Sequence, residues 1–289
     1  EILRCLVGSE MCIRDRCSVI LIKAENIMNL QNGKKRIVVK IGTSTLTHST
    51  GKANIALIAK LASVLSDLKN EGHQIVLVSS GAISVGMSRL RLAERPKETQ
   101  CLQAAAAVGQ SELMFLYDRL FSEYDVVVSQ LLLTFDELEN RESRAHLINT
   151  INQLLEYDCL PIVNENDSVS VEELVNGDND CLSATVAAIT DADLLVILTD
   201  TDGLYDGNPA ENKNAKLISV VDKIDDNIKS VTGCAGKRGT GGFITKINAA
   251  EIAVSSGIPV SIINGNKPTN IYKVVKGENV GTYFKAVEK

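Results

Sequence analysis

The sequence contains no tryptophan, and aromatic residues make up only 4% of its 289 residues. Proteins that bind single-stranded nucleic acid stack its bases on aromatic side chains, so this composition disfavours such a function. The net charge of -6 and the pI near 5.3 also differ from the basic character of most nucleic-acid-binding domains. No apolar run approaches the roughly 20 residues that a membrane-spanning helix requires. We therefore expect neither a nucleic acid nor a membrane as a partner.

The seven cysteines form no Cys-x-x-Cys pair, and their number is odd. A zinc site and a disulfide framework are therefore both unsupported. Free thiols fit a reducing compartment, so we expect a cytoplasmic protein. Histidine is also scarce, because His48, His73 and His146 are the only ones and none falls in a candidate site segment. This scarcity disfavours catalysis by a Ser-His-Asp or Cys-His arrangement.

Residues 1–33 differ from the rest of the chain. They hold three of the seven cysteines and have no sustained hydrophobic period. Arg14, Asp15 and Arg16 interrupt any apolar core that a signal peptide would need. We interpret this segment as a disordered or non-native leader, and we expect one domain over residues 34–289.

From residue 34 onward, short apolar runs alternate with segments of helical period. The patterns predict strands at 36–41, 74–79, 126–132, 159–164, 192–199 and 258–263, and helices at 54–70, 99–123, 135–156, 243–256 and 267–276. Residues 208–226 are polar and are expected to be irregular. Strands that alternate with helices, with small-residue turns at the strand ends, are typical of a parallel sheet with right-handed crossovers. We predict an α/β fold, a three-layer sandwich in which helices cover both faces of a mostly parallel central sheet.

Sites in open α/β sheets lie beyond the carboxyl ends of the strands. In this chain those ends carry small residues, hydroxyls, carboxylates and a lysine, in the segments 40–44, 79–82, 164–167 and 199–200. Lys40 ends an otherwise apolar strand, where its ammonium needs either a partner or a route to solvent. With the backbone amides of Gly42 and Thr43, it could face a phosphoryl group.

Two predicted helix starts add to these strand ends. Asp180 closes the sequence Gly177-Asp178-Asn179-Asp180 and is a candidate N-cap, because its side chain can accept from unpaired backbone N–H groups. Acids at this place could instead hold a cationic substrate group, or orient a lysine or a metal. The second start, RGTGGFITK at 238–246, is not a Walker A loop. Its glycines, helix N-terminus and lysine could still bind phosphate, and a flexible loop before a helix is the alternative.

Several segments, in this order, resemble the motifs of the amino acid kinase family: VVKIGTSTLT, VLVSSGAISVGM, PIVNENDSV, NGDNDCLSA, LLVILTDTDGLYDGNP and GTGGFITKINAAEIA. The resemblance covers about residues 34–284 and implies the three-layer fold of that family. Within it, the motifs are most similar to the branch that uses ATP to phosphorylate the side-chain carboxylate of L-glutamate at the start of proline synthesis, in the form without a C-terminal PUA domain. Two alternatives stay open. The chain could be a family member that acts on acetylglutamate, aspartate, carbamate or UMP, or a non-catalytic amino-acid sensor on the same fold.

The resemblance implies a role for each matching residue. Lys40 and Lys246 would neutralise charge on the transferred phosphoryl group, and Asp180 would hold both lysines. Ser80, Asp167 and Asn179 would bind glutamate, with Asp167 at its α-ammonium group. The residues implied in ATP binding are Lys40, Thr199, Asp200, Thr240, Gly241, Gly242, Phe243, Ile244, Thr245 and Lys246. The residues implied as backbone donors to phosphate or substrate are Gly42, Thr43 and Gly81.

The resemblance also implies partners. Mg²⁺ would be bound mainly through ATP, so we assign it no protein side chain. The family tends to form dimers or tetramers, and its glutamate-specific branch is subject to inhibition by proline. Phe243 departs from the family pattern, in which methionine is more usual, and this exchange of one apolar residue for another should matter little.

Overall fold

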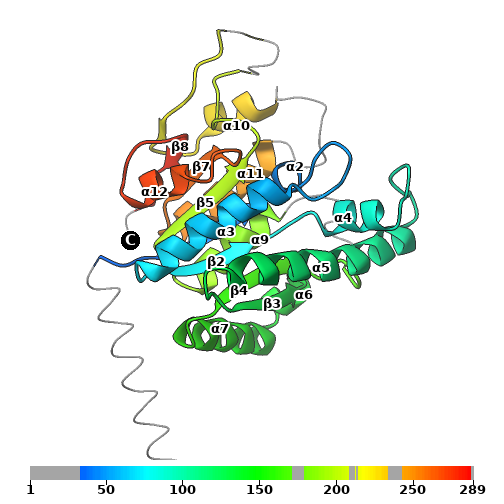
Figure 1. Cartoon of the computed structure of the whole chain (residues 1–289). Helices are drawn as coiled ribbons and strands as arrows, with labels where there is room; N and C mark the ends of the chain where they lie inside the picture. The colour runs from blue at the N-terminus through cyan, green and yellow to red at the C-terminus, as the bar shows by residue number, and fades with distance from the viewer. Residues whose placement is uncertain (1–32, 171–178, 208–211, 213, 234–242, 288–289) are drawn as a thin grey trace, which may run out of the picture.

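The structure is a computed structural model that describes residues 33–170, 179–207, 212, 214–233 and 243–287. The predicted leader therefore lies outside the described residues, except for Gly33. The described chain forms an eight-stranded sheet of order β3-β4-β2-β1-β5-β7-β8-β6 (Figure 1). The strands are β1 (Arg36–Ile41), β2 (Gln74–Val78), β3 (Val128–Leu133), β4 (Leu160–Glu165), β5 (Leu194–Thr199), β6 (Val220–Val221), β7 (Val260–Asn264) and β8 (Thr282–Phe284).

Neighbouring strands pair in parallel, except that β8 runs antiparallel to β7. The prediction of a mostly parallel sheet is confirmed. The strands β6 and β8 were not predicted, because two and three residues are too short to establish a period. Residues 208–226, expected to be irregular, contain β6.

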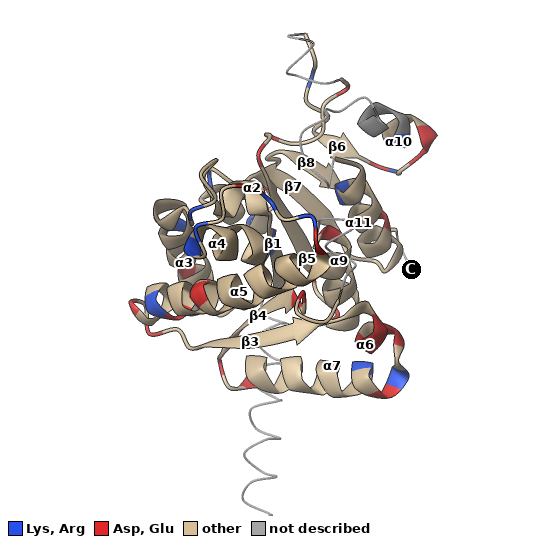
Figure 2. Cartoon of the chain, turned by 90° about the vertical axis from the view of Figure 1, so that its right-hand side faces the viewer, with Lys and Arg blue, Asp and Glu red and all other residues tan. Residues whose placement is uncertain are grey.

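Helices cover both faces of this sheet (Figure 2). One core cluster joins α3 and α5 to one face, and a second joins α7, α9 and α11 to the other. The described helices are α2 (Thr43–Leu46), α3 (Ile55–Asn70), α4 (Ala82–Arg89), α5 (Thr99–Ser122), α6 (Phe135–Glu139), α7 (Arg141–Glu156), α9 (Asp180–Ile189), α10 (Asp226–Gly233), α11 (Phe243–Ser255) and α12 (Asn270–Val275). The three-layer sandwich is therefore confirmed.

The alternation of side chains along β1 decides where Lys40 points. Val39 belongs to the core cluster under α3, and Val38 belongs to the cluster under α9 and α11. Side chains two residues apart in a strand lie on the same face. Lys40 therefore shares a face with Val38 and lies under the two helices whose first turns carry the other charged site residues.

One predicted helix is in fact two. The pattern over 135–156 is broken at Asn140, whose φ of -69° and ψ of 120° are extended. Its side-chain oxygen accepts hydrogen bonds from the N–H groups of Glu142 and Ser143, both at 3.0 Å, and so caps α7. Within the described residues, every helix is too short or too polar to span a bilayer.

Candidate active site

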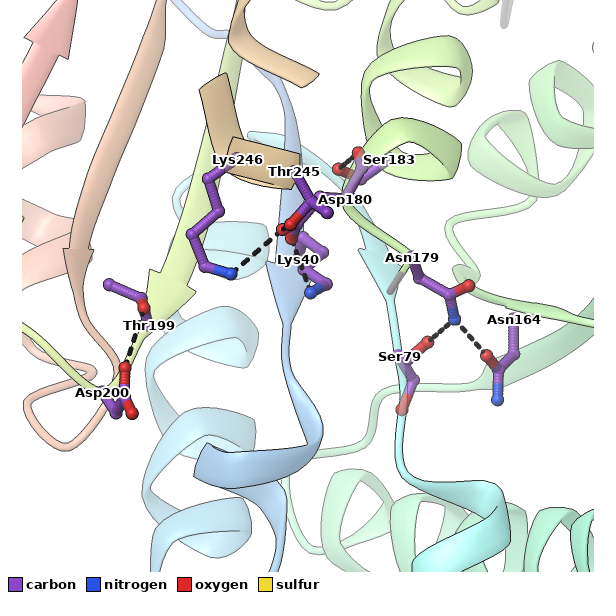
Figure 3. A network of polar contacts seen from close by, with 10 residues as sticks. All are labelled: Lys40, Ser79, Asn164, Asn179, Asp180, Ser183, Thr199, Asp200, Thr245 and Lys246. Atoms are coloured by element: carbon purple, nitrogen blue, oxygen red, sulfur yellow. Dashed lines mark hydrogen bonds and ion pairs between the residues drawn. The ribbon is translucent and has the colours of Figure 1, made fainter. Parts of the chain in front are cut away.

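Predicted site residues from several elements lie close together at the carboxyl edge of the sheet, and Figure 3 shows Lys40, Asn179, Asp180, Thr199, Asp200, Thr245 and Lys246 there. Lys40 comes from the end of β1, Asn179 and Asp180 from the start of α9, and Lys246 from the first turn of α11. Thr199 ends β5. Three groups of side chains lie along this edge.

The first group is centred on the carboxylate of Asp180, which is fully buried. Lys40 Nζ lies 2.6 Å from Asp180 Oδ1, and Lys246 Nζ lies 3.0 Å from Asp180 Oδ2. Thr245 Oγ1 also donates to Asp180 Oδ2, at 2.9 Å. The carboxylate thus holds two ammonium groups side by side at a strand end and two helix N-termini, an arrangement suited to a phosphoryl group.

Asp180 is not the N-cap of its helix, so that prediction is wrong. The helix α9 begins at Asp180, and the N-cap position is taken by Asn179, whose side chain makes no capping hydrogen bond. The carboxylate pairs with lysines instead. Hydrogen bonds between ionised partners are stronger than those to a neutral backbone N–H, and burial increases the difference. The alternative that this acid orients a lysine is the one the structure bears out.

The second group surrounds Asn179, which is fully buried. Its Nδ2 donates to the carbonyl oxygen of Ser79 at 2.7 Å and to Asn164 Oδ1 at 2.6 Å. Among the described residues, no hydrogen bond is accepted by Asn179 Oδ1 or made by Ser80 Oγ, although both atoms are buried. A buried polar atom in this condition is costly unless a ligand completes its hydrogen bonding. Asp167 is buried near the end of β4.

Gly81 makes the turn between β2 and α4. Its φ of 90° and ψ of 4° lie in the left-handed region, which residues with a Cβ rarely adopt. This conformation ends β2 abruptly, so Ser80 stays at the sheet edge while α4 begins at Ala82. The predicted turn is confirmed.

The third group lies on the β5 side of the edge. Thr199 is buried, and its Oγ1 donates to Asp200 Oδ1 at 3.2 Å, whereas Asp200 is exposed. In Figure 3 this pair lies on the opposite side of Lys246 from Asn179. Phe243 and Ile244 open α11, with Ile244 exposed. The predicted ATP-binding residues Thr240, Gly241 and Gly242 lie outside the described residues.

The backbone of Gly42 and Thr43 lies next to Lys40 of the first group. A Cβ on Gly42 would lie 3.5 Å from Lys40 Nζ, so this backbone passes directly beside the ammonium. Thr43 is the first residue of the single-turn helix α2. The turn predicted here is therefore helical, and it follows the buried lysine as expected.

The sequence did not predict roles for several polar residues that support the site. Asn164 Nδ2 donates to Gln110 Oε1 at 2.7 Å, and the Ser79 and Tyr117 hydroxyls lie 2.9 Å apart. Burial raises the pKa of Tyr117, so the phenol stays protonated. Asn164 and Ser79 lie at the ends of predicted strands, and this position could have indicated that they belong to the site. Gln110 and Tyr117 belong to a long helix whose sequence gives no indication that it reaches the site.

No cluster of three or more His, Cys, Asp or Glu side chains suitable for a metal ion occurs in the part of the chain that the structure describes. The donors gathered at the edge are ammonium, hydroxyl and amide groups, with single carboxylates among them. Such a donor set is suited to an anion and a small polar molecule more than to a metal held by the protein alone.

Comparison with known proteins fixes the family. Residues 35–264 match the sequence model of the amino acid kinase family. The chain belongs to the amino acid kinase family. This membership confirms the resemblance carried by the motifs, including those that supply Lys40, Asp180 and Lys246.

Curated relatives within this amino acid kinase family are glutamate 5-kinases. The chain is 50% identical over 250 residues to the glutamate 5-kinase of Clostridium acetobutylicum, covering 86% of this chain and 94% of that protein. It is 48% identical over 257 residues to the glutamate 5-kinase of Clostridium perfringens, covering 87% and 96%.

Solved structures with a similar fold come from other kinases. An isopentenyl phosphate kinase in a substrate complex has a TM-score of 0.62 at 18% identity, and the match covers 87% of this chain and all of that one. The carbamate kinase of Giardia lamblia bound to AMP-PNP has a TM-score of 0.61 at 15% identity, covering 88% and 99%. At such identities the likeness concerns the fold alone, and it supports the amino acid kinase-like architecture.

Proposed function

We propose that this protein uses ATP to phosphorylate the side-chain carboxylate of L-glutamate, giving L-glutamyl 5-phosphate and ADP, the first step of proline biosynthesis. The observation that carries the proposal is the 50% identity to a glutamate 5-kinase over 94% of that enzyme. The geometry agrees with this proposal. Lys40 and Lys246 are both held by the buried carboxylate of Asp180. They lie between the polar group around Asn179 and the Thr199–Asp200 pair (Figure 3).

The reaction would be a direct in-line transfer. One oxygen of the glutamate γ-carboxylate forms a bond to the γ-phosphorus of ATP while the bond from that phosphorus to the β–γ bridging oxygen breaks, and its electrons leave with ADP. The attacking carboxylate is already ionised at neutral pH, so no general base is needed. Catalysis is then positioning together with charge stabilisation.

Lys40 and Lys246 are the groups we assign to the charge of the transferring phosphoryl group. Their ammonium groups are fixed by Asp180 before any substrate binds, so no reorganisation is needed during the transfer. The backbone N–H groups of Gly42 and Thr43, beside Lys40, would add donors. Mg²⁺, bound mainly through the ATP phosphates, would supply further positive charge.

Ser80, Asp167 and Asn179 are assigned to glutamate, with Asp167 at its α-ammonium group. Thr199, Asp200 and the start of α11 are assigned to ATP, together with Thr240, Gly241 and Gly242, which lie outside the described residues. This division is supported by the separation of the Asn179 group from the Thr199–Asp200 pair on either side of the lysines (Figure 3).

The substrate test is direct. The purified protein is incubated with MgATP and L-glutamate, ADP release is followed, and hydroxylamine is added to trap an acyl phosphate as its hydroxamate. We expect both signals with L-glutamate, and neither with acetylglutamate, aspartate, carbamate or UMP. Turnover of one of these others instead would identify a different member of the family. Glutamate binding by calorimetry without ATP turnover would indicate a non-catalytic sensor.

Lys40→Met tests the central assignment. The substitution keeps most of the side-chain volume and removes the ammonium, so kcat should fall at least about 100-fold. Lys285→Met is the matched control, because Lys285 is more than half exposed and pairs with Asp222 away from the site. Wild-type turnover in a folded Lys40→Met protein would remove Lys40 from the mechanism.

Further expectations belong to the same proposal. Residues 34–289 would constitute one kinase domain, in a cytoplasmic protein that forms a homo-oligomer, either a dimer or a tetramer. Light scattering on the purified protein would measure its mass. Adding proline to the glutamate assay would show whether proline inhibits, and it should then compete with glutamate.

A further inference from the structure

A row of three buried side-chain amides leads from helix α5 to the site. Gln110 Oε1 accepts from Asn164 Nδ2 at 2.7 Å, and Asn164 Oδ1 accepts from Asn179 Nδ2 at 2.6 Å. The exposed fractions of these residues are 9%, 1% and 0%. The three amides come from α5, β4 and the residue preceding α9, so they join three layers of the fold at one point.

Backbone groups determine which way two of these amides face. The N–H of Glu165 lies 2.9 Å from Asn164 Oδ1, and a backbone N–H can only donate. The carbonyl oxygen of Ser79 lies 2.7 Å from Asn179 Nδ2, and a carbonyl can only accept. Asn164 must therefore place its oxygen toward Asn179, and its Nδ2 then points to α5. An acceptor is required there, and Gln110 supplies it.

We propose that Gln110 is a positioning residue for glutamate, acting through Asn164 to hold Asn179 with its oxygen, rather than its NH₂ group, available to the substrate. This inference rests on the function proposed above. Both hydrogens of Asn179 Nδ2 are used, and Oδ1 accepts no hydrogen bond from any described residue. At neutral pH the two carboxylates of glutamate only accept, and its α-ammonium group only donates. Asn179 Oδ1 therefore receives the α-ammonium.

Because the row ends at Asn179, we expect the side chain at position 110 to affect the binding of glutamate and not the binding of ATP. Without an acceptor on α5, the buried Nδ2 of Asn164 has no partner, which is costly, so the Asn164 side chain is expected to rotate away from its present position. Asn179 would then lose the acceptor that fixes one of its two hydrogens. The ammonium groups of Lys40 and Lys246 are held by Asp180 and stand outside this row.

The experiment compares Gln110→Met with Gln110→Glu by steady-state kinetics for both substrates. Methionine has a similar length and no oxygen, so the KM for glutamate should rise about 10- to 100-fold, while kcat and the KM for ATP stay within about threefold. Gln110→Glu keeps an acceptor oxygen for Asn164 Nδ2, so its KM for the substrate glutamate should stay within about threefold of wild type. Calorimetric binding of glutamate should follow the KM values.

Leu113→Met is the matched control. Leu113 is buried in the core on the same helix, and its side chain has no polar atom that could join the row of amides. This substitution tests the packing of α5 with the same introduced side chain and should leave the KM for glutamate unchanged. An equal rise in the Leu113→Met and Gln110→Met variants would overturn the inference, as would an unchanged KM in Gln110→Met.

The outcome stays decisive if Gln110→Met does not fold. A folded Gln110→Glu protein with a KM for glutamate raised tenfold or more would overturn the inference, and a KM near that of wild type would support it. A wild-type protein that neither binds nor phosphorylates glutamate would refute the proposed function, and this inference with it. Glutamate turnover in the wild type, with no effect of the Gln110 substitutions, refutes the inference alone.

Discussion

Among single residues, Asp180 is the centre of the charged group at the site. Lys40, Lys246 and Thr245 all reach its carboxylate, from one strand and one helix that lie far apart in the sequence. The neighbouring Asn179 has its contacts on the other side, with Ser79 and Asn164. Two adjacent residues thus serve different parts of the site.

Asp180→Asn should separate these functions. The substitution removes the charge that holds two buried ammonium groups, so we expect kcat to fall at least about 100-fold and the free energy of unfolding to fall by about 3 kcal/mol. The KM for glutamate should change little. Asn179→Ala should give the reverse pattern, with a raised KM for glutamate and a smaller loss of kcat. Steady-state kinetics and urea unfolding measure both, and equal kinetic effects of the two substitutions would show that the division is wrong.

His73 links the start of β2 to the start of β1. It is buried, and its Nδ1 accepts a hydrogen bond from the backbone N–H of Lys35 at 3.0 Å. Burial, and then the nearby charge of Lys34, lower the pKa of His73. The neutral form is therefore favoured in the folded state, and the unfolded chain binds a proton more readily.

The pH dependence of stability follows from this direction. The contribution of His73 is complete above the ordinary histidine pKa of about 6.5 and is lost as the pH falls below it, toward the lower pKa of the folded state. Urea unfolding at pH 7.5 and pH 5.5 should show a larger loss of stability in the wild type than in His73→Gln. The same loss in both proteins would mean that His73 is not responsible.

Among the elements, helices α4 and α5 cross unusually closely. A Cβ on Gly86 would lie 1.7 Å from the carbonyl oxygen of Ala105, and one on Gly109 would lie 1.8 Å from that of Ala82. Two glycines therefore permit this approach. The crossing fixes the position of α5. Gln110, which accepts the hydrogen bond from Asn164, is the next residue after Gly109 on this helix.

Gly109→Ala should push the two helices apart. We expect the free energy of unfolding to fall by at least about 2 kcal/mol, because the added methyl group meets backbone atoms that cannot move independently. The KM for glutamate should rise as well, since Gln110 would shift. Ala107→Ser, on the exposed side of the same helix, should change stability by less than about 0.5 kcal/mol. Thermal and urea unfolding distinguish the two variants.

Strand β8 fixes the segment that follows β5. Thr282 is fully buried, and its hydroxyl accepts from the N–H of Leu204 at 2.8 Å and donates to the carbonyl oxygen of Ile218 at 2.7 Å. Asn264 at the end of β7 also donates to Asp202 Oδ1 at 2.9 Å. These contacts hold the chain just beyond Thr199 and Asp200, the residues assigned to ATP.

Thr282→Val keeps the shape of the side chain and removes both hydrogen bonds. Two buried backbone groups lose their partner, so we expect the free energy of unfolding to fall by about 2 kcal/mol. The KM for ATP should rise several-fold while the KM for glutamate stays unchanged. Thr282→Ser, which keeps the hydroxyl, should remain close to wild type. A change in the KM for glutamate would contradict this assignment of β8 to the ATP side.

For the whole molecule, the order of strands places β1 between the residues we assign to glutamate and those we assign to ATP. Ser80 and Asp167, assigned to glutamate, follow β2 and β4, and Asn179 precedes α9. The residues assigned to ATP follow β5 or open α11, and β1 with Lys40 lies between β2 and β5. The phosphoryl group would pass over the middle of the sheet. On this assignment, Gln110 would support the glutamate side and Thr282 the ATP side.

If the glutamate side and the ATP side of the sheet are independent, the effects of substitutions on the two sides should be additive. In the Gln110→Met/Thr282→Val protein, the change in each KM should equal the change in the corresponding single variant, because the two side chains share no hydrogen-bond partner. Additivity of the free energies within about 0.5 kcal/mol is the expected result. A larger coupling, measured by the double-mutant cycle, would mean that the two halves of the sheet respond together.

The sequence by itself determined the central strands, the long helices and the edge at which the site lies. Apolar runs such as 36–41 and 194–199 became central strands, since a buried strand needs only local composition to be recognised. The motifs then established the family, and with it the roles expected for Lys40, Asp180 and Lys246. The break between α6 and α7 at Asn140 was not predicted. In the sequence, an asparagine that caps a helix cannot be told from an asparagine on the exposed face of a continuous helix.

Only the tertiary structure decided which partners the polar residues take. Asp180 could cap its own helix or pair with a lysine, and the choice depended on Lys40 and Lys246, which are remote in sequence. The orientation of Asn179 likewise depended on the carbonyl of Ser79, just after β2, and Asn164 found its acceptor in a glutamine of α5. Hydrophobic periods are local and can be read along the chain, whereas the hydrogen bonds of buried polar groups are settled by neighbours that packing brings together.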